Sequence, residues 1–98
     1  MIQIIALLYA CKNGLAGLRA FESKAIPILR EHGGVLISAS FNEHKIANEP
    51  DEIHVIQFPS IEKFDAYKSD ARVIDLASLK AEMIQKMDVY ITKSFHQY

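Results

Sequence analysis

The sequence "DEIHVIQFPSIEKF", residues 51–64, contains a strand, the end of that strand and the start of a helix. Pro59 cannot donate to a strand ladder, Ser60 is a preferred helix N-cap, and Glu62 lies where the helix dipole favours negative charge. Residues 52–58 follow the two-residue period of a strand, with Ile53, Val55 and Gln57 on one face and His54, Ile56 and Phe58 on the other. The stretch therefore predicts a strand that leads directly into a helix.

Two earlier segments also have strand character. Residues 35–43, "VLISASFNE", alternate in the same way, and a polar loop ending in Pro50 separates them from residues 52–58. These two segments predict a hairpin. Residues 2–9, "IQIIALLY", are rich in β-branched and aromatic side chains and end at a polar "CKNG" turn, which predicts the first strand.

A helix is expected between the first two strands, because a helical apolar rhythm runs from about residue 13 to His32. His32 falls in the last turn, where its charged form complements the helix dipole, and Gly33 or Gly34 supplies a left-handed cap. Pro27 removes one backbone donor. A kink near residues 23–24, or a helix split there, is therefore expected.

A second helical region follows residues 51–60. Residues 61–68 form its first part, and Ser69 with Asp70 has the character of a second cap. That cap predicts a further helix over residues 71–84, set at an angle to the first. Residues 86–93, "KMDVYITK", alternate again and predict the last strand.

The resulting order, β-α-β-β-α-β, predicts an α+β fold. Two βα crossovers around a central hairpin give the split β-α-β, or ferredoxin-like, topology, in which a four-stranded antiparallel sheet carries the helices on one face. The 98 residues fit a single domain over residues 1–98.

The sheet face left open by this topology is expected to be apolar. Ile5, Leu7 and Tyr9 share one face of the first strand, and we expect Ile56 and Phe58 to add to that face. Because a contiguous apolar patch usually marks an interface, the pattern predicts a homodimer with the two sheets face to face, a dimeric α+β barrel. The alternative is a monomer whose C-terminal tail covers the sheet.

Composition argues against several classes of partner. The net charge of −1 comes from 11 basic and 12 acidic side chains spread along the chain, so neither nucleic acid nor an anionic membrane is expected as a partner. Cys11 is the single cysteine, and the apolar N-terminal run is too short for a signal peptide or a membrane span, which favours a cytoplasmic location.

The sequence has no recognisable metal or cofactor motif. His44 and His96 have no metal-type spacing to each other or to His54, and no nucleotide, hydrolase, redox or zinc motif occurs. Neither a metal nor a cofactor is expected.

Three segments between residues 25 and 73 resemble a known family: "AIPILREHGGVLI" (25–37), "DEIHVIQFPSIEKFDAY" (51–67) and "KSDARV" (68–73). The helix ending in His-Gly-Gly and the strand ending in Phe-Pro-Ser are similar to those of the dimeric α+β barrel superfamily. Within it, the chain resembles the small domain-of-unknown-function proteins related to antibiotic-biosynthesis monooxygenases. Arg72 stands where this branch usually has an aromatic residue. The resemblance implies the fold and a dimer rather than a particular reaction.

His54 is the leading candidate for a functional residue. It lies in mid-strand on the face that carries Phe58, and with Ser38 and Ser40 of the neighbouring strand it is expected to form one wall of a ligand pocket. His54 is also the candidate catalytic acid or base. The alternative is a structural histidine, bonded to a neighbouring serine or to a carboxylate of the partner chain.

Other candidates for ligand binding are aromatic or charged. Tyr9 and Tyr90 lie near the ends of adjacent strands, where their hydroxyls are able to orient a ligand; the alternative is that they bury their rings and point their hydroxyls to water. His32 stays a candidate because of its "HGG" context. Tyr67 and Arg72 lie around the bend after residue 68, where Arg72 either holds a carboxylate or belongs to a solvated helix face.

Three functions remain compatible with these residues. The first is a homodimer that binds a small apolar or aromatic metabolite between sheet and helices. The second is a cofactor-independent monooxygenase- or isomerase-type enzyme that uses His54 or a tyrosine as acid or base. The third is a purely structural or regulatory dimer.

Overall fold

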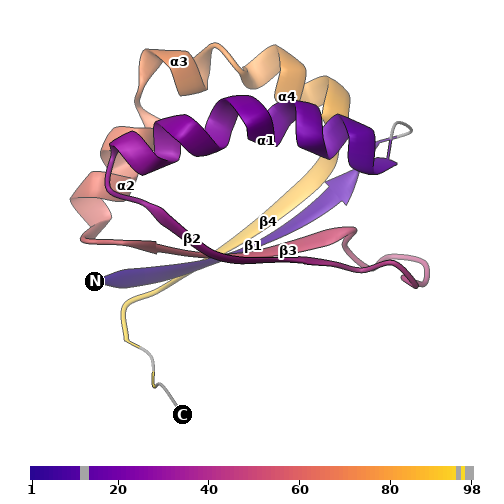
Figure 1. The fold of residues 1–98 in the computed structure, drawn as a ribbon, viewed down its shortest axis with the longest axis horizontal. Coiled ribbons are helices and arrows are strands. Elements are labelled where there is room, and N and C mark those ends of the chain that lie inside the picture. Colours follow the sequence, from indigo (N-terminus) through magenta and orange to yellow (C-terminus); the bar gives the residue numbers. More distant parts are fainter. Residues whose placement is uncertain (12–13, 95, 97–98) are drawn as a thin grey trace.

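The computed structural model describes residues 1–11, 14–94 and 96. Within these residues the elements are, in order, β1 (Ile2–Ala10), α1 (Gly14–Glu31), β2 (Val35–Phe41), β3 (Glu52–Phe58), α2 (Ile61–Lys68), α3 (Ala71–Ile74), α4 (Ala77–Met83) and β4 (Ile84–Thr92). The strands form one antiparallel sheet in the order β2-β3-β1-β4, and the helices form a layer on one side of it (Figure 1). The predicted α+β fold with a four-stranded antiparallel sheet is confirmed.

The pairing of β1 with β3 decides which side chains face the helices. Ile4 pairs with Ile56 and Ala6 pairs with His54, and directly opposed residues in an antiparallel pair project to the same face. These residues are buried under the helices. The expectation that Ile56 and Phe58 add to the open face is therefore wrong, because this register turns both of them toward the helices.

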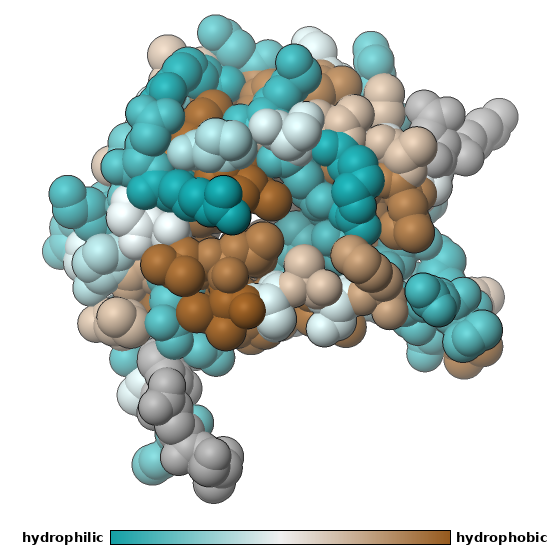
Figure 2. Space-filling view, viewed as in Figure 1, coloured by the Kyte–Doolittle hydropathy of each residue, from teal (hydrophilic) through white to brown (hydrophobic). Residues whose placement is uncertain are grey.

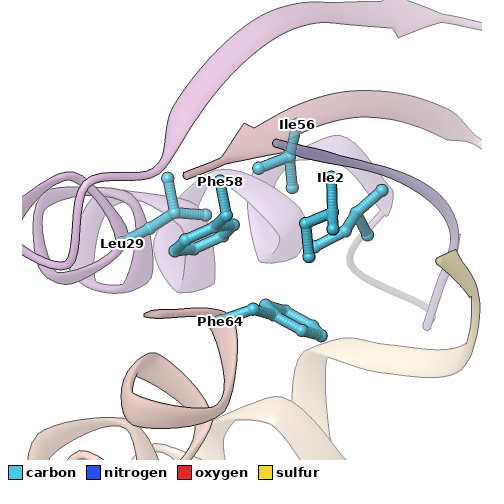
Figure 3. Close-up of a cluster of buried hydrophobic side chains, with 6 residues drawn as sticks. Ile2, Leu29, Ile56, Phe58 and Phe64 are labelled. Atoms are coloured by element: carbon cyan, nitrogen blue, oxygen red, sulfur yellow. The ribbon is translucent and has the colours of Figure 1, made fainter. Parts of the chain in front are cut away.

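The core lies between the sheet and the helices. Phe58, which is only 1 % exposed, contacts Phe64 of α2 with ring centroids 5.3 Å apart, and Leu29 of α1 points into the same cluster (Figure 3). A second cluster lies toward the other end of β1 and comprises Ala6, Leu8, Leu18 and Ile84. These two clusters fix α1 and α2 on the sheet through apolar burial.

A register shift in β2 changes the neighbours of His54. Leu36 pairs with Ile56, but the next paired residue is Ser38, opposite Val55, so Ile37 is the extra residue of a bulge. Ala39, rather than Ser38, therefore lies opposite His54. The expected wall of Ser38, Ser40 and His54 is wrong, because one inserted residue moves the following side chains to the other face.

The structure confirms the predicted helix N-caps but differs from the prediction in where helices are continuous and where they end. Helix α1 continues past Pro27 as one helix, so the expected split is wrong. Ser60 accepts a hydrogen bond from the backbone N–H of Lys63, and Asp70 accepts one from that of Arg72, which confirms both N-caps. The helix expected over 71–84 is divided into α3 and α4, and its last residue already belongs to β4.

The open face of the sheet is partly apolar. Ile5, Leu7 and Tyr9 of β1 lie on this face together with Ile53 and Val55 of β3, since each pair is in register. The apolar residues expected on the open face of β1 are thus present there. On β3 this face is extended by Ile53 and Val55 instead of Ile56 and Phe58. No helix within the described residues is long and apolar enough to cross a bilayer.

Candidate functional site

A cavity of about 430 Å³ lies between the sheet and the helix layer. Its lining is mostly apolar and includes Ile4, Ala25, Leu29, Ile56, Phe64, Met87 and Val89. Hydrophobic side chains are visible between the helices and the sheet edge, with hydrophilic side chains above them (Figure 2). A volume of this size with an apolar lining is typical of a small-molecule pocket.

Two of the polar residues in the cavity lining, His54 and Glu22, belong to one buried cluster. The Nε2 atom of His54 forms a short hydrogen bond with Oε1 of Glu52, and it lies 3.2 Å from Oε2 of Glu22. Glu52 is fully buried beneath them, with 0 % exposure. The imidazole nitrogen therefore lies between two carboxylates.

Arg19 holds the outer side of this cluster. Its Nη1 donates to Oε2 of Glu52 over 2.8 Å and also forms a short hydrogen bond with Oε1 of Glu22. The guanidinium carbon lies 4.5 Å from the ring centroid of Phe41, a cation–π contact that fixes the side chain. In each carboxylate, one oxygen thus accepts a hydrogen bond from Arg19 and the other lies next to His54 Nε2.

Local sequence explains how these residues meet. Glu52 and His54 are two apart on β3, so both project to the helix-facing side. Arg19 and Glu22 are three apart on α1 and share its sheet-facing surface. Sequence reasoning identified His54 but missed both carboxylates. Two features of the sequence could have indicated these carboxylates. Glu52 and His54 have the spacing of residues on one face of a strand, and Glu22 occupies an apolar position in the helical pattern.

The cluster is electrostatically coupled. Burial opposes protonation of His54, but its contacts with Glu22 and Glu52 outweigh burial and raise the pKa of the imidazole. Burial, reinforced by the neighbouring Glu22, raises the pKa of Glu52. Burial acts in the same direction on Glu22, but its contacts with His54, Glu52 and Arg19 lower the pKa of this carboxylate. The cluster therefore keeps Glu22 ionised beside an apolar cavity.

The structure separates the predicted site residues into three groups. His54 and Tyr67 line the cavity, and Phe58 packs against Tyr67 in the core with ring centroids 5.9 Å apart. Tyr9, Tyr90 and Ser38 belong to the opposite, open face of the sheet, in register with Lys86, Ile5 and Val55. A single pocket therefore does not contain all the predicted residues.

His32 and Arg72 form the third group, at the C-terminal end of α1. His32 Nε2 lies 2.8 Å from Oδ2 of Asp70, and Arg72 bonds both Asp70 and Glu31. Arg72 thus holds carboxylates of its own chain and joins α3 to α1. Neither residue lines the cavity described above.

Glu22, Glu52 and His54 also have the donor atoms of a metal site. One ligand atom from each residue lies within 4.8 Å of the other two, and all three residues are buried. Nitrogen and carboxylate oxygen donors of this kind suit Zn²⁺ and the first-row divalent metals.

No protein-family model and no curated protein matches the sequence. Solved structures do match. A protein of unknown function from Rhodopseudomonas palustris superimposes with a TM-score of 0.81 at 13 % identity, covering 98 % of this chain and 83 % of that one. A dimeric protein of unknown function from Bacteroides fragilis, described with a ferredoxin-like fold, has a TM-score of 0.68 at 10 % identity, covering 95 % of each chain. The chain has the ferredoxin-like α+β fold.

A third neighbour connects the fold to the resemblance noted in the sequence. A protein from Nitrosomonas europaea, provisionally assigned as an antibiotic biosynthesis monooxygenase, has a TM-score of 0.72 at 12 % identity, covering 98 % of this chain and 100 % of that one. The predicted resemblance is therefore confirmed for the fold. Identities this low carry no information on activity.

Proposed function

We propose that this protein binds a small apolar or aromatic molecule in the cavity between sheet and helices. The observation that supports this most directly is the 430 Å³ apolar cavity with the Glu22–His54 pair in its wall. An apolar lining supplies affinity through burial, and a few convergent polar groups orient the ligand. Tyr67 adds an aromatic surface to the same cavity.

The proposed functional unit is a homodimer that pairs the open sheet faces. Ile5, Leu7, Ile53 and Val55 supply an apolar centre to that face, and Tyr90 is 57 % exposed beside it. Exposed apolar patches of this kind favour a protein partner. A second copy of the chain presents the same apolar surface, and the Bacteroides fragilis neighbour is described as dimeric.

A cavity-filling variant tests ligand binding. Val89 lines the cavity and is 45 % exposed, so Val89→Trp fills the space with little cost to the core. We expect anilinonaphthalene sulfonate to bind at least about 10-fold more weakly to this variant, roughly 1.4 kcal/mol. Ile46→Trp, at a loop residue that is 70 % exposed, is the matched control. Equal binding of the probe to both variants would rule out the cavity as the binding site and favour a structural dimer.

A second candidate function is cofactor-independent catalysis on an acidic C–H compound. It is favoured by Glu22, whose ionised carboxylate borders the apolar cavity and whose Oε2 lies next to His54 Nε2. A desolvated carboxylate is an effective general base. The probe is 5-nitrobenzisoxazole, an aromatic carbon acid that loses its C–H proton as its N–O bond breaks and forms a coloured phenolate. Turnover that is lost in Glu22→Gln and kept in Ile46→Trp would support catalysis, and turnover equal in all three proteins would exclude it.

A further inference from the structure

We propose that Glu22, Glu52 and His54 form a binding site for a divalent metal ion of the Zn²⁺ or first-row transition class. This inference goes beyond the proposed binding of an apolar molecule and does not depend on it. It also reverses the expectation of no metal, which considered only spacings among histidines and known motifs. The site draws its three ligands from α1 and β3, elements far apart in the sequence.

The three donor atoms lie close enough together to share one metal ion, within 4.8 Å of one another. His54 Nε2 and Glu22 Oε2 are 3.2 Å apart, and Glu52 Oε1 closes the triangle. Ligands bound at about 2.0–2.2 Å in a tetrahedral site are separated by about 3.3–3.6 Å. A metal ion among these three atoms replaces the hydrogen bond between His54 and Glu52, and Nε2 and Oε1 move apart to this ligand spacing.

The cluster also leaves one carboxylate oxygen without a hydrogen bond. An imidazole Nε2 has at most one proton to donate, and it lies closer to Glu52 Oε1 than to Glu22 Oε2. Among residues 1–11, 14–94 and 96, the buried side-chain oxygen Oε2 of Glu22 has no hydrogen-bond partner, and its side chain is only 9 % exposed. Such an oxygen is costly to bury. A cation between the three atoms satisfies it, which is independent support for a bound ligand.

Arg19 acts as a positioning residue for this site. Its Nη1 bonds the other oxygen of each carboxylate, so Glu22 Oε2 and Glu52 Oε1 both turn toward His54. Hydrogen bonds that orient metal ligands from outside are a usual feature of metal sites. When His54 gives up its proton to bind a metal, the two carboxylates and the guanidinium carry a net charge of −1, which favours a cation at this position. With only three protein ligands, and with Glu22 and His54 lining the cavity, a fourth coordination position opens toward it.

The test is titration of chelator-treated full-length protein with Co²⁺ and with Zn²⁺. We expect one equivalent of Co²⁺ per chain with visible absorption bands, and one equivalent of Zn²⁺ by calorimetry. Glu22→Gln and His54→Gln should each weaken binding by about 100-fold or more, because loss of a direct ligand costs at least as much as loss of an orienting residue. His44→Gln, at an exposed loop histidine, is the matched control and should bind normally.

A measurement on the unmodified protein keeps the proposal testable if a variant fails to fold. Zn²⁺ added to ¹⁵N-labelled protein should shift the imidazole resonances of His54 alone among the four histidines. Shifts confined to other histidines, no binding at millimolar metal, or equal binding by all variants would overturn the proposal and leave a closed ion-pair cluster. A chelator that leaves 5-nitrobenzisoxazole turnover unchanged would separate a free carboxylate base from a metal-dependent one.

Discussion

Gly34 shows how a single residue sets the distance between α1 and β3. A Cβ atom at this position would lie 2.6 Å from Leu29 Cδ2 and 2.7 Å from Phe58 Cζ. Both neighbours are buried core side chains, 5 % and 1 % exposed, so they have little room to move. The glycine is therefore needed for the close approach that brings the end of α1 onto β3, and with it the wall of the cavity.

Gly34→Ala should destabilise the protein by about 1–3 kcal/mol through overpacking. Chemical denaturation followed by circular dichroism measures this change. Gly14→Asn is the control, because Gly14 has a φ of +57° that asparagine tolerates, and a Cβ there meets no atom within 4 Å. A free energy of unfolding equal to that of the wild type in Gly34→Ala would mean that the core relaxes around the added methyl group.

At the scale of elements, Asp70 connects three helices. It caps α3, accepts a hydrogen bond from Arg72, and contacts His32 just after α1, while α2 ends two residues before it. Hydrogen bonds from Arg72 and His32 hold the pKa of this carboxyl well below its ordinary value. A carboxyl with a depressed pKa stabilises the fold above its unfolded pKa, and this contribution is lost as the pH falls toward the folded value.

Asp70→Asn should therefore lower the Tm near neutral pH while keeping a residue that caps helices well. The difference from the wild type should shrink below about pH 4, where the unfolded carboxyl becomes protonated. Thermal unfolding at a series of pH values measures this. Asp65→Asn is the control, since that side chain is exposed and its ion pair within the described part of the chain is with the likewise exposed Lys68. A difference in Tm that does not change with pH would mean that the ion pairs of Asp70 contribute nothing to stability.

At the scale of the whole molecule, the two faces of the sheet differ in what covers them. One face is covered by helices and contains the cavity, and the other presents Ile5 and Val55 at its centre. Homodimerisation through this second face is the prediction that belongs to this scale. A single-domain organisation over residues 1–98 and a cytoplasmic location also stay predictions.

Light scattering at micromolar concentration should give twice the chain mass of 11.1 kDa. Val55→Lys should give the monomer mass, because it places two charges against each other or against apolar surface in the interface. Ile46→Lys, in an exposed loop, should remain dimeric. A monomeric wild type, or a dimer unaffected by Val55→Lys, would show that another surface is used.

Local sequence determined much of the fold. The strand-forming composition of β1, the two-residue period of β3, the proline at 59 and the caps at Ser60 and Asp70 act within a few residues. The element order, and with it the topology predicted from that order, therefore follows from short-range preferences. The continuity of α1 through Pro27 was less predictable from local sequence, because packing on the sheet stabilises this helix beyond its local preferences.

Tertiary structure alone decided the candidate site. Which face of β3 meets the helices depends on its register with β1, and the bulge at Ile37 moved Ser38 away from His54. The contact of Arg19 with Glu52 joins residues 33 apart, and it depends on how α1 is rotated over the sheet. Local preferences do not encode that rotation, because it results from burying the whole apolar stripe of α1 at once. The sequence therefore determined the topology and named His54, and only the packed fold brought Glu22 and Glu52 to it.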